Sequence, residues 1–508
     1  MLLAPEPWHP QDRAVGRAGR RSFPAAWRQP QRTHVRNLFL RLLGAMFFIA
    51  FWSLGSQVVL LFGHDGLLPA ATYLQSLPAA GRLFDAPTLF WFGCSDASLR
   101  AAAVAGALIS ILLILNVAPR YCLIALWVLY LSFATIGQDF LSFQWDNLLL
   151  ESAFCAVFVA PGGVRRGRQV PPYALAVFLM QWLLFRLHVE SGAAKLLTGD
   201  PSWRDLTAMV SYYETAPLPT WVGWYAHQMP VWAHKLTALF TFVIELGAPL
   251  LIWGPRRLRA AVFLGMIALQ VTVILTANYG FFNYLSMALC LFVLDDGHLR
   301  WVAARVGRTL TDALPARVTA TGALGLAAVT LILVPLSLVP FFSFLGPFSH
   351  DLLPLRRSLN GLRSINAYHL FAQMTLVRRE VVIEGSEDGA HWVPYEFRYK
   401  PGDPERAPAF VAPHQPRVDF QLWFLTLGGR STPRYFGNLL ARLFAAPGAM
   451  APLFAHDPFA DKPPAFLRVG FYRYQFSDWA TRRASGAWWR RELLGYSNNM
   501  TPESLRVR

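Results

Sequence analysis

Residues 171–220 read PPYALAVFLMQWLLFRLHVESGAAKLLTGDPSWRDLTAMVSYYETAPLPT, and this stretch decides how the fold is interpreted. The apolar run over about residues 172–189 is long enough to cross a membrane as a helix. Residues 190–220 then form a long connection that is aromatic and mixed in charge. Long loops between rigid supports commonly carry function, so residues 190–220 are the central candidate region. The alternative interpretation is an amphipathic re-entrant segment that only covers the helix ends.

The composition indicates a membrane protein. Of the 508 residues, 54% are hydrophobic and only 15% are charged, whereas a soluble protein carries roughly 25% charged residues. The formal net charge of +16 could suggest a nucleic-acid partner. Many of the arginines, however, stand at the ends of apolar runs, where they act as topology signals or contact anionic lipids. We therefore expect membrane lipids among the partners and no nucleic acid.

The cysteines and the N-terminal segment exclude two other interpretations. The four cysteines form no CxxC pair and no Cys/His metal spacing, so neither a disulfide framework nor a metal site is expected. Residues 1–36 are rich in Arg and Pro and contain no apolar stretch of their own. We expect them to be a disordered basic tail rather than a cleavable signal peptide.

Apolar runs predict a polytopic α-helical membrane domain of about nine spans over residues 37–346. Basic connections alternate with acidic or aromatic ones, which by the positive-inside rule places the N-terminus in the cytoplasm and the C-terminus outside. The seventh and eighth runs meet at Tyr279 and could instead form one broken re-entrant hairpin, which would move the C-terminal domain to the other side. The predicted spans cover about residues 38–62, 99–117, 121–137, 148–160, 172–189, 236–253, 260–277, 281–294 and 324–344.

After residue 346 the sequence changes to alternating, aromatic-rich segments. These predict a mostly β, soluble, extracytoplasmic domain over residues 347–508, on the same side as residues 190–220. The turn sequence GSEDG lies between two short strand-like segments and predicts a β-hairpin. The expected elements are strands at 380–383, 392–399, 418–427 and 467–476 and a helix at 434–444.

Lys195 is the strongest candidate for chemistry, at the end of the fifth run. A lysine in an apolar membrane mouth is easier to deprotonate because desolvation disfavours its charged form, and this is the condition for a basic amine. His188 lies seven residues before Lys195 and would share a helix face with it, whereas Glu190 would not stack on it. In the structural alternative, Lys195 extends to the interface or pairs with Glu190 or Asp205.

Other polar residues favour structural roles. Glu151, just inside the fourth run, could cap a helix, bind Arg204 or line a polar cavity. Glu245 stands alone in the sixth run and is expected to face a partner inside the bundle. Arg417 and Asp419 are two residues apart and would form an ion pair on one strand face. The aromatic side chains at 203, 212, 213, 221, 224 and 225 could form a substrate platform or anchor the chain at the membrane interface.

Long motifs resemble the lipase maturation factor family. They are FQWDNLLLE (143–151), GDPSWRDLTAM (199–209), YYETAPLPTWVGWYAHQMP (212–230), ANYGFFNYLSMALCLFVLDD (277–296), VVIEGSEDG (381–389), FRYKPGD (397–403) and APHQPRVDFQLWF (412–424). The sequence departs from that family at Phe420, where a Trp is expected, and at Tyr212–Tyr213, where His beside Tyr is usual. The candidate motif residues are Asp146, Asn147, Glu151, Trp203, Arg204, Asp205, Tyr213, Glu214, His414, Arg417 and Asp419.

The resemblance implies a multi-span protein that assists the folding and assembly of secreted dimeric lipases, in the endoplasmic reticulum membrane of animals. The few cysteines and the Arg-, Ala- and Pro-rich usage suggest a bacterial relative in the inner membrane, with the C-terminal domain in the periplasm. Its clients would then be exported proteins, lipases among them.

A shorter stretch, SGAAKLLTGDPSW (191–203), resembles the vitamin K-dependent γ-glutamyl carboxylase and its bacterial relatives, which share the HTTM membrane domain. In the carboxylase the matching lysine is thought to deprotonate the reduced quinone, and here it is Lys195.

Two hypotheses follow. The favoured one is a non-enzymatic maturation factor or chaperone, because no GxSxG, HExxH, P-loop or GxGxxG motif is present. The alternative is a membrane-embedded enzyme with Lys195 as base. No cofactor is expected under the first hypothesis, and a quinone or lipid is possible under the second.

Overall fold

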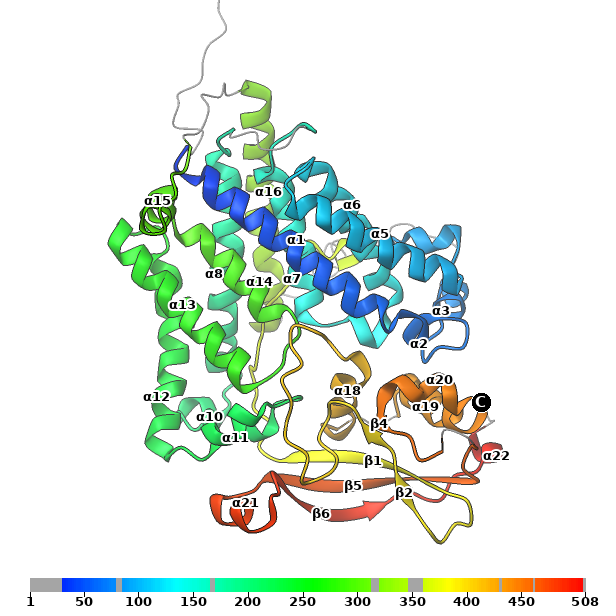
Figure 1. Ribbon diagram of the computed structural model, residues 1–508. Coiled ribbons are helices and arrows are strands. Elements are labelled where there is room, and N and C mark those ends of the chain that lie inside the picture. The colour runs from blue at the N-terminus through cyan, green and yellow to red at the C-terminus, as the bar shows by residue number, and fades with distance from the viewer. Residues whose placement is uncertain are drawn as a thin grey trace, which may run out of the picture.

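The computed structural model describes residues 30–78, 85–164, 170–311, 319–345, 360–428, 432–459 and 462–505. A bundle of long helices carries a smaller domain of strands and short helices at one of its ends (Figure 1). We call this end of the bundle the domain end. Residues 1–29 of the predicted tail and the predicted boundary at residue 346 lie outside the described ranges. The first long helix begins at Thr33, inside the segment expected to be a disordered tail.

Seven helices within the described residues are long and apolar enough to cross a membrane. Two predicted spans correspond to shorter helices, α7 (Gln144–Val159) and α14 (Phe282–Cys290), the latter continuing in η7 (Leu291–Val293). The seven are α1 (Thr33–Gly55), α5 (Asp96–Ile114), α6 (Pro119–Ile136), α8 (Ala174–Leu197), the segment Val231–Leu251, α13 (Arg256–Thr276) and α16 (Ala320–Leu345, apolar over Ala320–Phe342). Segment Val231–Leu251 consists of α12 (Val231–Phe242), the π-helix η5 (Val243–Gly247) and η6 (Ala248–Leu251).

Contacts at both ends show that α14 with η7 runs through the whole depth of the bundle. Arg32, beside the start of α1, donates to the carbonyl oxygen of Phe292 at the end of η7. At the domain end, the Asn278 amide, just before α14, donates to the carbonyl oxygen of Ala409, 2.9 Å away. The turn at Tyr279 therefore separates two passages through the bundle. The predicted polytopic helical membrane domain is confirmed; within the described residues it has seven helices long enough to span a membrane and two shorter ones, so the count of about nine is approximate.

Short helices cover the ends of the long ones. Helix α8 continues to Leu197, so the first part of the 190–220 region is helical and extends the fifth span. The rest of that region forms short helices at the domain end (Figure 1). The short elements of the helical part are η2 (Pro30–Arg32), α2 (Val58–Phe62), α3 (Ala70–Ser76), η3 (Leu89–Phe92), η4 (Gln138–Leu141), α9 (Pro201–Arg204), α10 (Ala208–Thr215), α11 (Trp221–His227) and α15 (Asp296–Arg305).

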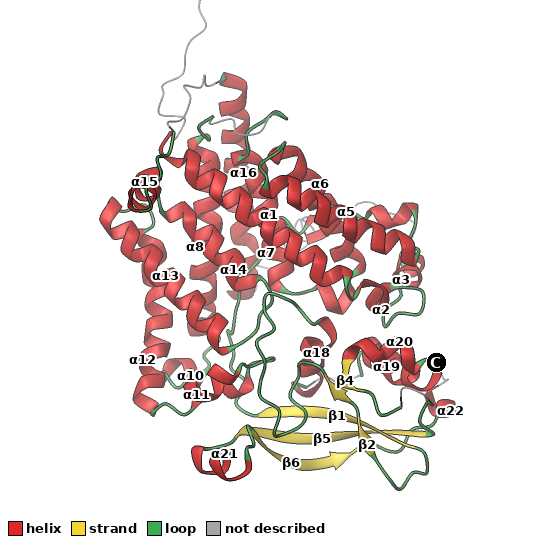
Figure 2. Cartoon of the chain, viewed as in Figure 1, coloured by secondary structure: helices red, strands yellow, loops and turns green. Residues whose placement is uncertain are grey.

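The C-terminal domain contains a four-stranded antiparallel sheet in the order β2-β1-β5-β6 (Figure 2). Strands β1 and β2 form the predicted hairpin, and β5 and helix α19 confirm the predicted strand at 467–476 and helix at 434–444. The strands are β1 (Arg378–Ser386), β2 (Val393–Pro394), β3 (Glu396–Phe397), β4 (Phe454–His456), β5 (Phe466–Phe476) and β6 (Trp489–Tyr496), with β3 and β4 in a separate ladder. The helices are α18 (Arg417–Leu422), η8 (Trp423–Thr426), α19 (Arg434–Ala445), α20 (Pro447–Met450), η9 (Ala451–Leu453), α21 (Trp479–Ser485) and α22 (Pro502–Leu505).

The predicted strand at 418–427 is wrong, because this segment is helical in α18 and η8. Apolar residues at 418, 420, 422 and 424 alternate as in a strand, but Val418 and Leu422 also have the four-residue spacing of a helix. In a short apolar run that is buried on several sides, the spacing of apolar residues does not distinguish a strand from a helix. Strand β6 was not predicted, since its exposed Arg490, Arg491 and Glu492 hide any alternation.

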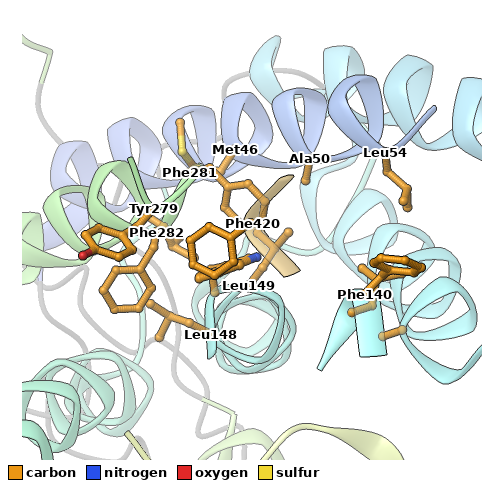
Figure 3. Packing of buried hydrophobic residues seen from close by; sticks show 14 of the residues in the cluster. Met46, Ala50, Leu54, Phe140, Leu148, Leu149, Tyr279, Phe281, Phe282 and Phe420 are labelled. Atoms are coloured by element: carbon orange, nitrogen blue, oxygen red, sulfur yellow. The ribbon is translucent and has the colours of Figure 1, made fainter. Parts of the chain in front are cut away.

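The apolar core of the bundle continues into the C-terminal domain. Figure 3 shows Phe420 of α18 among core residues of the bundle that include Tyr279 and Phe282. The Phe420 ring meets the ring of Trp145 edge to face, with centroids 5.0 Å apart, and that of Phe143 at 5.2 Å. Such aromatic contacts contribute beyond their buried area. The two parts of the chain are therefore packed against each other through shared core residues.

Candidate functional site

The link between the last long helix and strand β1 is the centre of the candidate site. We call residues 363–377 the strap; they contain no regular helix or strand. An irregular segment has no internal hydrogen-bond ladder, so its buried backbone groups need partners elsewhere. The domain ends of α7, α8 and η5 supply those partners, and most of the predicted site residues lie there.

Arg186 joins two buried carboxylates on neighbouring helices. Its Nη1 lies 2.7 Å from Glu151 Oε1 in α7, and its Nε lies 2.9 Å from Glu190 Oε1 one turn further along α8. All three side chains are at most 4% exposed. One cation between two carboxylates leaves one surplus negative charge, which is costly in a buried site unless other donors solvate it. Glu151 was expected to cap a helix or bind Arg204, but its cationic partner is Arg186.

The strap supplies those additional donors. The backbone N–H of Tyr368 donates to Glu190 Oε2 at 3.0 Å, and the Tyr368 hydroxyl donates to Glu151 Oε2 at 2.8 Å. The backbone N–H and the side-chain amide of Asn366 also donate to Glu151 Oε2, at 3.0 and 2.9 Å. In return, Arg186 donates to the Asn366 carbonyl oxygen. The carboxylates of the bundle and the donors of the strap thus complete one polar cluster.

Lys195 anchors the next part of the strap. Its Nζ lies 2.7 Å from Glu245 Oε2 in η5, and it also donates to the carbonyl oxygens of Leu370 at 2.9 Å and Ser191 at 3.3 Å. The interior partner expected for Glu245 is therefore confirmed. The prediction that Lys195 pairs with Glu190 or Asp205 is wrong. Element η5 packs beside the end of α8 and brings Glu245 closer to Lys195.

The sequence after Lys195 ends α8 and starts α9 within a few residues. Gly199 adopts a left-handed backbone with φ of +71°, which glycine allows without steric cost. Asp200 then caps α9 by accepting from the Ser202 N–H at 2.8 Å, with a proline at the first helical position. The other Asp200 oxygen accepts from the N–H of Met374 in the strap at 2.6 Å. Trp203, in α9, donates to the strap carbonyl of Phe371 at 2.8 Å.

A second junction joins the bundle to α18. Arg417 forms two hydrogen bonds with Asp146 of α7, from Nη1 at 2.7 Å and from Nη2 at 2.8 Å. The Tyr130 hydroxyl donates to the same carboxylate at 2.5 Å. Burial lowers the pKa of Arg417, but the charge of Asp146 outweighs this effect and holds the pKa above its ordinary value. Arg417 is therefore firmly charged and paired one to one.

The predicted ion pair between Arg417 and Asp419 is wrong. In a helix, residues two apart point to different sides, so Arg417 faces the bundle while Asp419 faces its own domain. Asp419 Oδ1 accepts from the backbone N–H groups of Tyr399 at 2.9 Å and Lys400 at 3.0 Å. Burial raises the pKa of Asp419 despite these hydrogen bonds.

A third junction lies between α10 and the sheet. Glu214 Oε2 accepts from the backbone N–H of Phe476, at the end of β5, at 2.7 Å. Arg378, the first residue of β1, is fully buried, and its Nη1 and Nη2 donate to the carbonyl oxygens of Glu214 and Pro217 at 3.0 and 2.9 Å. Burial raises the pKa of Glu214. The motif ETAPLP thus holds the start of the sheet.

The other predicted site residues take separate positions. The carbonyl oxygen of Asn147 accepts from Asn366 at 3.4 Å, and His414 Nδ1 lies 2.9 Å from the Ser53 hydroxyl in α1. Tyr213 is buried, whereas Arg204 and Asp205 are exposed. His188 is buried on α8 with Nδ1 3.0 Å from the Leu184 carbonyl oxygen, and its Nε2 has no hydrogen-bond partner among the described residues.

Sequence reasoning missed the residues that connect these groups. Arg186 was detectable, because a cation within an apolar run is expected to have a buried partner. The strap residues carried no comparable signal, since a polar segment between domains resembles an ordinary linker. The residues missed are Arg186, Asn278, Arg363, Asn366, Tyr368 and Arg378.

A cavity of about 1020 Å³ lies between the bundle, the strap and α18. Lys195, Trp203 and Tyr213 of the predicted site line it, together with Glu245. Within the described residues, no group of three His, Cys, Asp or Glu side chains is placed to hold a metal ion. The charged groups of the three junctions are hydrogen-bonded or ion-paired to the strap and the C-terminal domain. This arrangement is suited to holding the domain in place rather than to transferring protons.

Comparison with known proteins gives one family along most of the chain. The family model of the lipase maturation factor transmembrane domain matches residues 34–301, and that of the lipase maturation factor C-terminal domain matches residues 364–498. Lipase maturation factor 2 of Homo sapiens is 35% identical over 581 residues, covering 90% of this chain and 81% of that protein. Lipase maturation factor 1 of Bos taurus is 32% identical over 541 residues, covering 99% and 94%. No significant match to a solved structure was found.

Proposed function

The chain belongs to the lipase maturation factor family, and from this premise we propose how it acts as a multi-pass membrane maturation factor for lipases. The C-terminal domain holds a partly folded exported lipase at the membrane surface while the lipase folds or assembles. The observation that carries this proposal is an exposed sheet edge with a cluster of apolar side chains, on a domain that is attached to the bundle at three junctions.

The sheet edge is formed by β6 and its neighbour β5. Strand β6 is the last strand of the sheet and lies on the side away from the helix bundle (Figure 1). Phe471, Leu493, Leu494 and Tyr496, here called the edge patch, are 43%, 45%, 52% and 43% exposed. An edge strand has unpaired backbone donors and acceptors, so an extended segment of another chain can add to it. The edge patch would supply apolar contacts for such a segment.

The junctions explain why this edge can work as a holding surface. Buried polar groups with complete hydrogen bonds fix two elements in a single arrangement. The Arg186 cluster, the Arg417–Asp146 pair and the Glu214 junction attach the domain at separate points. A pre-fixed surface loses little freedom when a client binds, so more of the contact energy remains as affinity.

We further propose that the C-terminal domain lies in the periplasm of a bacterial inner membrane, and in the lumen of the endoplasmic reticulum for eukaryotic relatives. Basic residues near the end opposite the domain end support a cytoplasmic location for that end. They include Arg36, Arg120, Arg256, Arg259 and Arg300.

The enzymatic alternative gains no support from the geometry of Lys195. Its ammonium group carries three protons and already has acceptors from Glu245, Ser191 and Leu370. A base must be free of its proton next to the substrate. Here the lysine is instead held by a carboxylate and two backbone carbonyl oxygens.

Co-expression with an exported lipase tests the edge patch. The double substitution Leu493→Glu and Leu494→Glu should lower active lipase per lipase mass at least about fivefold, because two charges would face an apolar client segment at the centre of the contact. Val393→Glu is the matched control, since Val393 is 42% exposed on β2 at the opposite edge of the same sheet. Equal lipase activity with both variants at equal protein level would refute the proposal.

Labelling of a single cysteine tests the orientation. Asp403→Cys in a Cys94→Ser background places a thiol on an exposed loop, while the other three cysteines are buried. A membrane-impermeant maleimide should label it in cells with a permeabilised outer membrane and an intact inner membrane. Labelling only after lysis would place the domain in the cytoplasm.

A further inference from the structure

The cavity between the bundle and the strap is not used by the holding function. Its walls come from α8, α12, α13 and α14, from residues 369–377 of the strap, and from α18 with η8. Residues of α7 and α10 also line it, so the cavity lies at the domain end of the bundle. Its volume of about 1020 Å³ is in the range of small-molecule sites.

The walls present more apolar than polar surface, with threonine, glutamine, asparagine and histidine side chains among the aromatic and aliphatic ones. The aromatic side chains include Phe143, Trp145, Phe282, Phe371, Phe420 and Trp423. Among the polar ones, Gln270 and Asn283 are bonded to each other at 2.7 Å. The one buried cation in the wall, Lys195, is neutralised by Glu245 within the described residues. The interior therefore accepts an uncharged, apolar group.

The opening differs from the interior. Arg379 lines the cavity and is exposed, and its guanidinium has no hydrogen-bond or ion-pair partner among the described residues. An apolar interior with a cation at the edge fits an amphiphile.

A polypeptide segment fits this cavity less well than a lipid chain. Three of the strap carbonyls that border it are occupied: Leu370 by Lys195, Phe371 by Trp203 and Ala372 by Thr198. The helical walls satisfy their own backbone groups. An extended peptide inside would leave many of its N–H and C=O groups unpaired, which is costly away from water. An acyl chain has no such groups.

We infer that this cavity binds a long-chain acyl lipid with an anionic head group, with the chain inside and the head group beside Arg379. A free fatty acid and a membrane phospholipid share this chemistry. The inference does not depend on the nature of the client, and its test does not use client maturation.

Native mass spectrometry of the full chain in detergent tests the inference, with palmitate and phosphatidylglycerol as separate probes. Thr241→Phe fills the cavity from α12, and Leu239→Phe adds the same ring on an exposed position of the same helix as the matched control. We expect Thr241→Phe to lower the bound fraction about tenfold and Leu239→Phe to leave it unchanged. Binding of palmitate alone would identify a fatty acid, and binding of phosphatidylglycerol alone a membrane lipid.

Arg379→Gln tests the head-group contact. It should weaken binding of palmitate about tenfold and leave binding of the uncharged hexadecanol unchanged, because only the former carries a carboxylate. Equal binding of both probes by the wild type and Thr241→Phe would overturn the inference. So would saturable binding of an apolar peptide that palmitate does not displace.

Discussion

Two of the three buried junctions that hold the C-terminal domain balance charge differently. At the strap, Arg186 serves two carboxylates, and hydrogen bonds from Asn366 and Tyr368 compensate the surplus negative charge. At α18, Arg417 meets one carboxylate, Asp146, with two hydrogen bonds. The first junction depends on several donors from the strap, whereas the second is balanced within a pair. When the arginine is removed, a second substitution of one carboxylate should therefore restore stability at α18 more fully than at the strap.

The largest effect is expected at the strap. Arg186→Met leaves two buried carboxylates without a cation, which should cost at least about 3–5 kcal/mol of unfolding free energy. Thermal unfolding in detergent, followed by tryptophan fluorescence, measures the loss. Arg308→Met, on an exposed loop away from the junctions, is the control. An unfolding midpoint equal to that of the control would mean that the cluster is not needed for the fold.

At α18 we expect a similar loss of unfolding free energy, which a second substitution can largely reverse. Arg417→Met leaves one buried carboxylate and should cost about 3–5 kcal/mol. Adding Asp146→Asn removes that charge and keeps an acceptor for Tyr130, so most of the loss should be recovered. At the strap, Glu151→Gln in the Arg186→Met background should recover less, because Glu190 still lacks its cationic partner. Equal recovery at both junctions would contradict the difference in charge balance.

A smaller effect is expected from one donor of the strap. Tyr368→Phe removes the hydroxyl that donates to Glu151 and should cost about 1–3 kcal/mol, the range for a buried acceptor that loses its donor. Tyr225→Phe, on an exposed ring of α11, is the matched control. The same thermal measurement checks both, and a midpoint shift no larger than that of the control would exclude a role for the strap in neutralising the cluster.

The smallest effect is a pH dependence at the third junction, where His227 Nε2 of α11 lies 3.7 Å from Glu214 Oε2. Burial, helped by the charge of His234, lowers the pKa of His227 to about 4 from an ordinary 6.5. The unfolded chain therefore binds the proton more tightly, and stability should fall as the pH drops from about 6.5 to about 4, by at most about 3 kcal/mol. Unfolding midpoints at pH 7.5 and 5 should differ less in His227→Gln. The raised pKa of Glu214 changes stability in the opposite direction with pH, and it is common to the wild type and the His227→Gln variant. If the difference between the midpoints at pH 7.5 and 5 is the same in both, His227 is not the source of the pH dependence.

Much of the helical architecture could be predicted, because membrane spans leave long apolar runs. The interior partner of Glu245 followed from the cost of an isolated charge in a span. The contacts of the strap could not be predicted, since they depend on which irregular residues reach which helix end. The error at residues 418–427 has a related cause: a segment buried on several sides has apolar residues at both strand and helix spacing, and Arg417 is directed by its partner on α7 rather than by a local pattern.

The separation in sequence between Glu190 and Tyr368 also sets an order of events during synthesis. The two residues that meet in the cluster are 178 positions apart. At about 5–20 residues per second, roughly 10–35 seconds pass between the synthesis of one and of the other. During this interval the nascent bundle has its acidic residues in place but lacks the strap that completes their solvation. The polar cluster of the membrane part is therefore complete only after the strap, at the start of the C-terminal domain, has been synthesised. A ribosome that stalls before the strap leaves a bundle in which Glu151 and Glu190 lack the hydrogen bonds from Asn366 and Tyr368.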